Sequence, residues 1–428
     1  MTDIANSSTG HSSLAPFRVR SFRFQWPADL FTSWALEMET IILGWWVLVE
    51  TESVLWLTLF GSLQFIGTLV APLLGVLGNR GGFRSMLCTL RMIYTVKAAL
   101  MMLLALFGAL NPTYVFLLAA IMGIVRPSDL VMRNALIGQT MPPSHLSGAM
   151  SVSRTTSDSA RVAGALAGAA MVTTLGMGMA YVAITLFYAI SFALTLGVAR
   201  DRPAATHTDA AGLAIERSSP WRDLREVFAY VWNTPHLLAA MFLAFMINLT
   251  AYPITSGLMP YVAKDVYQSG QSGLGYLVAS FAFGGLLGSL ILSHNGKWVM
   301  CGRMMISFAA LWYAMLLVFA QLHSATFGIP VLVLTGCVQS FALVPMSVLI
   351  IRSSDERYRG GVLGLRMLAV YGLPIGLVVA GPLINNFSLR TMLSIYAVFG
   401  LSVVAFIAWY WHAAVWADDS PANRPNQR

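Results

Sequence analysis

The amino-acid sequence predicts an all-α membrane protein with 12 transmembrane helices, arranged as two similar six-helix halves. Hydrophobic residues make up 57% of the chain and charged residues only 10%, whereas a soluble domain carries about 25% charged residues. Mean hydropathy is +0.70. Apolar runs of membrane-spanning length recur along the chain, and one long polar stretch divides them into two equal sets.

Each predicted span follows from the length of its apolar run, because a helix that crosses the hydrocarbon core needs about 20 apolar residues. The first-half spans fall near 25–49, 54–77, 86–109, 113–135, 148–174 and 177–199. The second-half spans fall near 236–258, 271–293, 299–321, 328–351, 361–386 and 391–414.

These spans define five regions of the chain. The linker contains WRDLREVFAYV, whose helical spacing of apolar residues predicts a short interfacial helix. The regions are an N-terminal tail (1–24), a six-helix bundle (25–199), the linker (200–235), a second six-helix bundle (236–414) and a C-terminal tail (415–428).

The distribution of basic residues predicts the orientation in the membrane. The net charge is +8, but the basic residues are spread over short loops rather than gathered in a nucleic-acid-binding stripe. Nearly all loop arginines fall on the side that holds both termini, and the opposite side receives only Lys264 and Arg390. The positive-inside rule therefore places both termini in the cytoplasm, and we expect a bacterial inner-membrane protein.

The sequence contains no sign of a cofactor site. Cys88, Cys301 and Cys337 lie far apart in apolar segments, without metal-ligand spacing. No zinc-protease motif, nucleophile elbow or phosphate-binding loop is present. We expect a monomer that is not an enzyme, with no metal or cofactor, whose partners are protons, a small-molecule substrate and the bilayer.

The turn after the second span, GVLGNRGGFRSML, carries a family motif. It resembles the signature G-x-L-[AG]-D-R-x-G-R-[KR] of the major facilitator superfamily, with Asn79 in place of the aspartate. The resemblance implies the major facilitator fold, alternating access and a conformational role for this turn. The residues to which it assigns that role are Gly75, Asn79, Arg80, Gly82 and Arg84.

Longer stretches resemble the drug and siderophore exporters of this superfamily. They are the opening FRVRSFRFQWPADLFTSWALEMETIILGWWVLVETES, the run PSDLVMRNALIGQTMPPSHLSGAMSVSR and the run ERYRGGVLGLRMLAVYGLPIG, which contains Arg359. The glycines Gly164 and Gly168 partly match the superfamily's antiporter motif. The resemblance implies proton-driven efflux of a small organic molecule such as a siderophore.

Carboxylates within the first span are candidates for proton coupling. At 100° per residue, Asp29, Ser33, Glu37, Thr40 and Gly44 fall within about 80° of arc and predict one polar stripe. Glu37 lies near the middle of the span and is the first candidate proton carrier, because an intramembrane carboxylate is commonly functional. Asp29 is a second candidate.

Glu39 points away from that stripe. It is either a further proton-coupling candidate or the partner of Lys97, which lies mid-span in the third helix and needs a counter-charge in a structural ion pair. Arg91 is close enough to the cytoplasmic end of its helix to extend toward the interface.

Two similar charge patterns, RPSDLVMR (126–133) and RTTSDSAR (154–161), lie on successive helices. Each places two arginines and one aspartate on one helical face. If the helices are offset by a turn, Asp129 and Asp158 can face arginines of the other helix. Arg126 and Arg161, the deepest pair, are candidate contacts of an anionic substrate, with Asp129 and Asp158 as further candidates, or else the whole group is a structural clamp between the two helices. Arg133 and Arg154 are expected to form a structural clamp.

The second half is nearly free of charge within the membrane. Its notable polar groups are candidate substrate contacts or helix-packing hydrogen bonds. They are Asn248, Tyr252, Gln339 and Tyr371.

Together these features predict a proton-coupled exporter of an anionic or zwitterionic organic molecule. Three alternatives remain open: uptake of an anionic solute or siderophore by proton symport, multidrug efflux of cations, and a membrane sensor that transports nothing. Resemblance to exporters is the only feature of the sequence that favours export over uptake.

Overall fold

The computed structural model describes residues 15–69, 82–199, 220–294, 301–355, 358–412 and 416. Within these ranges the regular structure is helical. The first half contains η1 (Ala15–Arg18), α1 (Arg20–Thr51), α2 (Val54–Leu63), η2 (Ile66–Leu69), α4 (Phe83–Leu106), α5 (Pro112–Thr140) and α6 (Pro143–Leu196).

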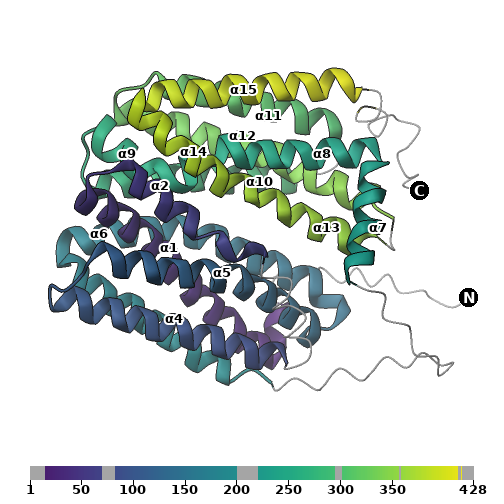
Figure 1. The fold of residues 1–428 in the computed structure, drawn as a ribbon. Helices are drawn as coiled ribbons and strands as arrows, with labels where there is room; N and C mark the ends of the chain where they lie inside the picture. The colour runs from purple at the N-terminus through teal and green to yellow at the C-terminus, as the bar shows by residue number, and fades with distance from the viewer. Residues whose placement is uncertain are drawn as a thin grey trace, which may run out of the picture.

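The second half begins with α7 (Pro220–Trp232), which crosses the end of the bundle (Figure 1). One long helix follows, formed by α8 (Pro235–Met246), η3 (Ile247–Ala251), η4 (Ile254–Leu258), α9 (Met259–Tyr261) and η5 (Val262–Val266). The remaining elements are α10 (Gln271–His294), α11 (Cys301–Ala320), α12 (Ala325–Ser353), α13 (Arg359–Leu368), η7 (Ala369–Tyr371), α14 (Gly372–Asn386) and α15 (Leu389–Tyr410).

The prediction of 12 spans in the major facilitator architecture is confirmed. Nine described helices are long and apolar enough to cross a membrane. One of these, α6, has 54 residues and covers two predicted spans. The two spans meet at Gly176, where φ is +78°, a backbone conformation that glycine adopts without the strain a side chain would cause. The helix that corresponds to the first predicted span, α1, is not among these nine. The second is described only as far as Leu69.

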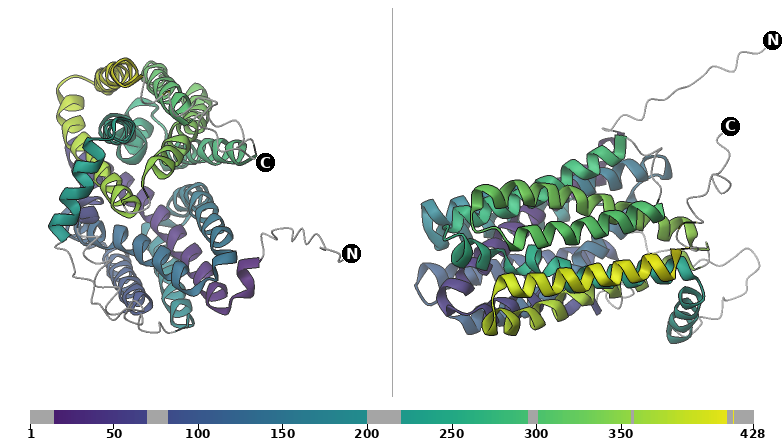
Figure 2. Two further views of the ribbon diagram at one scale, coloured as in Figure 1. Left: turned by 90° about the vertical axis from the view of Figure 1, so that its right-hand side faces the viewer. Right: turned by 90° about the horizontal axis from the view of Figure 1, so that it is seen from above.

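The helices form two groups that lie side by side (Figures 1 and 2). Residues of α1 to α6 make up one group, and those of α8 to α15 the other. Each group has an apolar core, and a few residues of α1, α2 and α6 also join the second-half core. The first-half core includes Met38, Tyr94 and Met132, all fully buried, and the second-half core includes Trp312 and Met346.

The seventh span departs from a regular α-helix. It contains three π-helical stretches, with Pro253 and Pro260 between them. Proline has no N–H for the helical ladder, and π-helical turns occur frequently at functional sites. Asn248 and Tyr252 lie at the first of these stretches, which brings their side chains to the space between the halves.

Candidate functional site

A cavity of about 810 Å³ lies between the two halves. Its walls differ in charge, because every charged residue among the described lining residues comes from the first half. The charged residues are Glu37, Arg126, Arg154, Asp158 and Arg161. The second-half wall offers uncharged polar groups, including Asn248, Tyr252, Thr255, Ser289, Gln339, Ser340 and Ser347. The described wall therefore carries one surplus positive charge.

The cavity reaches the end of the bundle at which α1 begins. Its lining includes Arg154 near the start of α6 and Ser293 near the end of α10. At the opposite end the halves are in contact: Ser62 Oγ donates to the carbonyl oxygen of Pro374 at 3.2 Å. There Gly275 lies so close to α6 that an added Cβ would be 2.6 Å from that of Ala169. The structure is thus open at one end and closed at the other.

Glu37 and Arg126 form an ion pair at the cavity wall. The Arg126 guanidinium lies 3.3 Å from Glu37 Oε1 and donates at 3.4 Å to Thr40 Oγ1 and to Gln64 Oε1. The Arg126 side chain is 33% exposed and that of Glu37 is 17% exposed. A solute in the cavity can therefore reach both groups. Sequence reasoning missed Gln64, although a lone amide in the apolar second span was a usable signal.

Arg161 is exposed in the cavity and lies on the same helix as Arg154 and Asp158. Arg154 Nε lies 3.3 Å from Asp158 Oδ2, one turn away on α6. In the described part of the chain no carboxylate lies within salt-bridge distance of Arg161. Its guanidinium is therefore available to an anion.

The two repeated arginine patterns do not pair with one another, in contrast to the expectation of a clamp between the fourth and fifth helices. Asp158 pairs within α6. Asp129 instead pairs with Arg133 of its own helix at 2.8 Å and lies 3.8 Å from Arg91 of α4. The reason is the rotation of α5, which directs this face toward α1 and α4 rather than α6.

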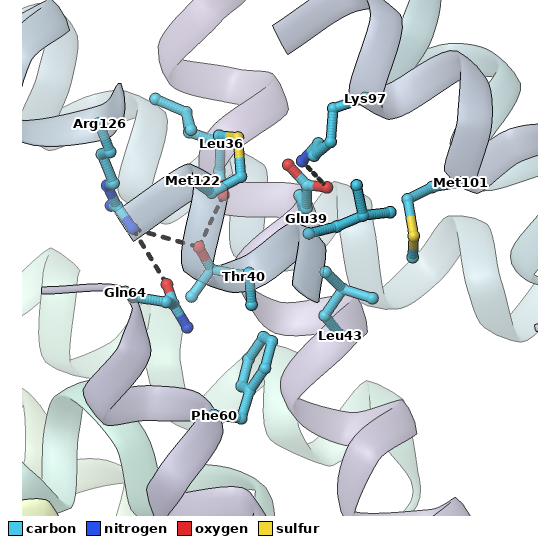
Figure 3. A pocket seen from close by; sticks show the side chains of 12 residues that line it. Leu36, Glu39, Thr40, Leu43, Phe60, Gln64, Lys97, Met101, Met122 and Arg126 are labelled. Carbon is cyan, nitrogen blue, oxygen red and sulfur yellow. Dashed lines mark hydrogen bonds and ion pairs between the residues drawn. The ribbon is translucent and has the colours of Figure 1, made fainter. Parts of the chain in front are cut away.

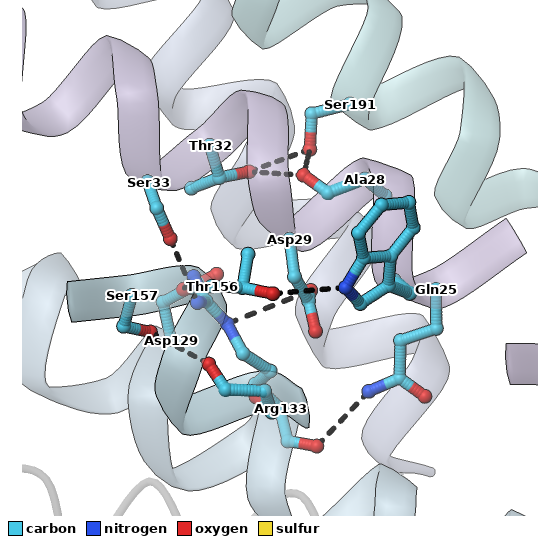
Figure 4. A network of polar contacts seen from close by, with 12 residues as sticks. Gln25, Ala28, Asp29, Thr32, Ser33, Asp129, Arg133, Thr156, Ser157 and Ser191 are labelled. Atoms are coloured by element: carbon cyan, nitrogen blue, oxygen red, sulfur yellow. Dashed lines mark hydrogen bonds and ion pairs between the residues drawn. The ribbon is translucent and has the colours of Figure 1, made fainter. Parts of the chain in front are cut away.

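A buried charge cluster forms where α1, α4 and α5 meet. Figure 4 shows three of its members, Asp29, Asp129 and Arg133. Asp29 pairs with Arg91 and lies 3.5 Å from Arg133 Nε. Arg133 also donates to Ser33 Oγ at 3.1 Å. Arg91 is fully buried, so the expectation that it extends to the interface is wrong. The cluster balances two arginines with two aspartates, and it holds Asp29 and Asp129 away from the cavity lining.

Glu39 is buried beside Lys97, and the two form an ion pair (Figure 3). Two tyrosines of α6 complete its surroundings: Tyr181 donates to Oε1 at 3.2 Å and Tyr188 to Oε2 at 3.1 Å. The sequence analysis did not single out these tyrosines, although their seven-residue spacing places both on one face of a helix.

On the second-half wall, the side-chain amide of Gln339 donates to the Tyr252 hydroxyl at 2.6 Å. Asn248 donates to the carbonyl oxygen of Ala244 at 2.9 Å and also lines the cavity. Tyr371 is placed differently, because its hydroxyl donates at 3.1 Å to the carbonyl oxygen of Ile66 and so joins the halves. Three of the four polar candidates of this half therefore reach the cavity.

The family-motif turn is only partly described. Gly75, Asn79 and Arg80 lie outside the described residues. Gly82 precedes α4 with φ of +87°, and Arg84 donates to the carbonyl oxygen of Leu196 at 2.6 Å. Arg359 begins α13. In the described ranges no group of histidine, cysteine, aspartate or glutamate residues has the arrangement of a metal site.

Comparison with known proteins gives two consistent results. The Major Facilitator Superfamily model matches residues 40–377. A bacterial homolog of the human lysosomal transporter Spinster, in an inward-facing and unoccupied conformation, has a similar structure, with a TM-score of 0.70 and 14% identity. The match covers 95% of this chain and 99% of that one.

Two further solved structures share the fold. The nucleoside transporter NupG matches with a TM-score of 0.68 and 15% identity, over 91% of this chain and 98% of its own. The POT family transporter PepTSo matches with a TM-score of 0.68 and 12% identity, over 92% and 98%. No curated protein sequence matches the chain.

Proposed function

Because this chain belongs to the Major Facilitator Superfamily, we propose that it exports a small zwitterionic or anionic organic molecule, siderophore-like in its charge, in exchange for protons. The observation that carries the proposal is the ion pair between Glu37 and Arg126 in the wall of the central cavity. Alternating access would come from rocking of the two halves about that cavity.

The pair provides a physical basis for coupling. A zwitterion that enters between Glu37 and Arg126 can place its cationic group on the carboxylate and its anionic group on the guanidinium. A proton on Glu37 removes the negative charge that the cationic group requires. Proton and substrate then compete for one carboxylate, and such competition is the requirement for exchange of one for the other.

Other lining residues favour the same class of substrate. Arg161 offers a second guanidinium, which suits a carboxylate or phosphate oxygen. Tyr252 and Gln339 offer uncharged hydrogen-bonding groups across the cavity. Multidrug efflux of cations is less well supported, since Arg161 leaves a positive charge in the wall and Asp29 lies in the buried cluster.

The proposed orientation fits export. If both termini lie in the cytoplasm of a bacterial cell, the open end of the cavity faces the cytoplasm, where an exported compound binds first. The inward-facing conformation of the Spinster homolog is consistent with this orientation.

Uptake of a purely anionic solute is the second candidate, and the same ion pair favours it. Protonation of Glu37 would release Arg126 for an anion, so proton and anion would bind together rather than compete. The number of positive groups on the substrate therefore decides between exchange and symport.

The test of direction is a comparison of metabolites in cells and medium, with and without this gene, in iron-rich and iron-poor growth. A compound trapped in the deletion cells and missing from the medium supports export and names the substrate. A compound left unused in the medium supports uptake and refutes export.

The test of coupling uses Glu37→Gln, with Glu50→Gln as the matched control, because Glu50 is an exposed carboxylate at the far end of the same helix. In vesicles, Glu37→Gln should abolish transport driven by a pH gradient, because the amide neither binds a proton nor carries the charge that the substrate requires, whereas Glu50→Gln should leave that transport unchanged. Unchanged pH-driven transport in Glu37→Gln would refute the role of Glu37.

A further inference from the structure

The second-half wall of the central cavity carries a strip of aliphatic side chains. This apolar strip consists of Leu286 and Leu290 from α10 and of Val344, Val348 and Ile351 from α12. Residues three or four apart lie on one face of a helix, so each set follows its helix axis. Leu290 is 55% exposed and Ile351 is 43% exposed. Large aliphatic side chains are therefore left uncovered where they line the cavity.

Close packing of α10 against α12 brings the two sets together. An added Cβ at Gly284 would lie 1.9 Å from the carbonyl oxygen of Val333, and one at Gly288 would lie 2.6 Å from that of Cys337. Small residues at such contacts let two backbones approach closely. The contacts advance in step along both helices, so α10 and α12 run in the same direction and the apolar strip is shared between neighbours.

Three serines beside the apolar strip already donate their protons to the backbone. Ser289 and Ser347 each donate to a carbonyl oxygen three or four residues earlier in its own helix, at 2.9 Å and 2.8 Å. Ser340 donates to the carbonyl oxygen of Gly285 at 2.7 Å, which joins α12 to α10. A hydroxyl has one proton, so these serines offer a ligand no further donor. Apolar contact is therefore the main interaction that this part of the wall offers.

The apolar strip extends from the middle of the cavity toward its open end. Arg126 and Gln339 are each the central residue of a 29-residue helix, α5 and α12, so both lie at mid-depth. Beyond Gln339, the stretch from Val344 to Ile351 rises about 10 Å along α12. A ligand whose charged end is held by Arg126 and Glu37 can thus lay the rest of its length on the strip.

We propose that the substrate is an amphiphile, in which the charged head group bound at Glu37 and Arg126 is joined to a short alkyl chain or an aromatic group that lies on the apolar strip. Such a molecule is complementary to a cavity with charges on one wall and exposed aliphatic side chains on the other. Each methylene group that leaves water strengthens binding about fourfold. This inference rests on the proposed function and names the class of its substrate.

The experiment measures binding to purified full-length protein in lipid nanodiscs, with empty nanodiscs as the correction for partition into lipid. The labelled probe is octylphosphocholine, which joins a zwitterionic head to an alkyl chain. Phosphocholine, the head alone, and octyl glucoside, the chain on an uncharged head, are the competitors. We expect octylphosphocholine to bind at least about tenfold more tightly than phosphocholine. Equal affinities of these two, or no binding of the probe, would overturn the proposal.

Two neighbouring residues of α10 provide matched variants. Leu290 lines the cavity, whereas Ile291, which is 45% exposed, does not line it. Leu290→Asn should weaken binding of octylphosphocholine about fivefold or more and leave that of phosphocholine unchanged, and Ile291→Asn should change neither. If both variants weaken the probe equally, the chain does not lie on the apolar strip and the proposal fails.

A second pair of variants serves if Leu290→Asn does not fold. Val348→Thr keeps the shape of the side chain and replaces one methyl by a hydroxyl. Its control is Val398→Thr, because Val398 of α15 is also exposed, at 55%, but lies outside the cavity lining. Weaker binding of octylphosphocholine in Val348→Thr alone supports the proposal, and equal binding in both variants contradicts it.

Failure of this inference is distinguishable from failure of the proposed function. If octyl glucoside competes as strongly as octylphosphocholine, the apolar strip holds the chain but Glu37 and Arg126 do not select a charged head. If phosphocholine binds as tightly as octylphosphocholine, the head site stands and the role of the apolar strip is refuted.

Discussion

Arg91 offers the sharpest test of how the first half is held together. Its side chain is fully buried, pairs with Asp29, lies 3.8 Å from Asp129 and also contacts Thr195. Arg91→Met keeps an unbranched, flexible side chain but removes the guanidinium and its charge. The cluster would then hold two aspartates and one arginine, with an uncompensated negative charge in a site without solvent.

The expected cost follows from burial. Removing one partner of a buried ion pair costs about 3–5 kcal/mol, because the remaining charge stays desolvated. Arg154→Met is the matched control, since Arg154 also pairs with an aspartate but its side chain is 81% exposed. Breaking an exposed pair costs about 0–1 kcal/mol. The two variants should therefore differ by about 2–5 kcal/mol in the free energy of unfolding.

The measurement is unfolding in mixed micelles as the fraction of denaturing detergent is raised, followed by tryptophan fluorescence. Arg91→Met combined with Asp29→Leu restores equal numbers of positive and negative charges in the cluster, so it should recover part of the lost stability. If Arg91→Met is no less stable than Arg154→Met, the cluster does not hold the helices together and the reasoning fails.

Two more predictions concern the closed end of the cavity and the cavity wall. Gly275→Leu should prevent closure of the closed end, because an added Cβ would lie 2.6 Å from that of Ala169, whereas Gly270→Leu, in open space, should not. For the measurement, a cysteine replaces Thr40, and an impermeant thiol reagent is added at the closed end. The cysteine should be labelled faster in Gly275→Leu than in Gly270→Leu, and equal labelling would contradict the prediction. Tyr252→Phe removes a hydroxyl that faces the cavity and accepts a 2.6 Å hydrogen bond. The loss of one hydrogen bond lowers the binding free energy by about 1 kcal/mol and should raise KM for the identified substrate about fivefold. An unchanged KM would show that this wall does not contact the substrate.

The number and the approximate bounds of the spans were predictable from the sequence. Apolar length is a local property, and a charge-poor run such as α15 can hardly lie anywhere but in the membrane. The predicted seventh span, 236–258, was too short, since the helix continues to Val266 through Pro253 and Pro260. The π-helical turns absorb those prolines, and their formation depends on neighbouring helices that a sequence pattern does not specify.

The candidate site was predictable only in part. The periodicity of α1 correctly places Glu37, Thr40 and Gly44 on one face, and all three line the cavity. Asp29 and Ser33 belong to the same stripe but lie in the buried cluster. One face of a long helix meets different neighbours along its length, so a shared stripe does not imply a shared environment.

The sequence by itself determined the protein class, the number of spans and the face of each helix that carries charge, because these depend on residues within one segment. Tertiary structure alone decided the partners: that Asp29 meets Arg91, that Arg126 meets Glu37, and that Arg161 has no carboxylate partner among the described residues. Ion pairs between helices depend on the rotation and depth of each helix relative to its neighbours. Those quantities are set by packing of side chains far apart in the chain, and charge spacing along one helix does not contain them.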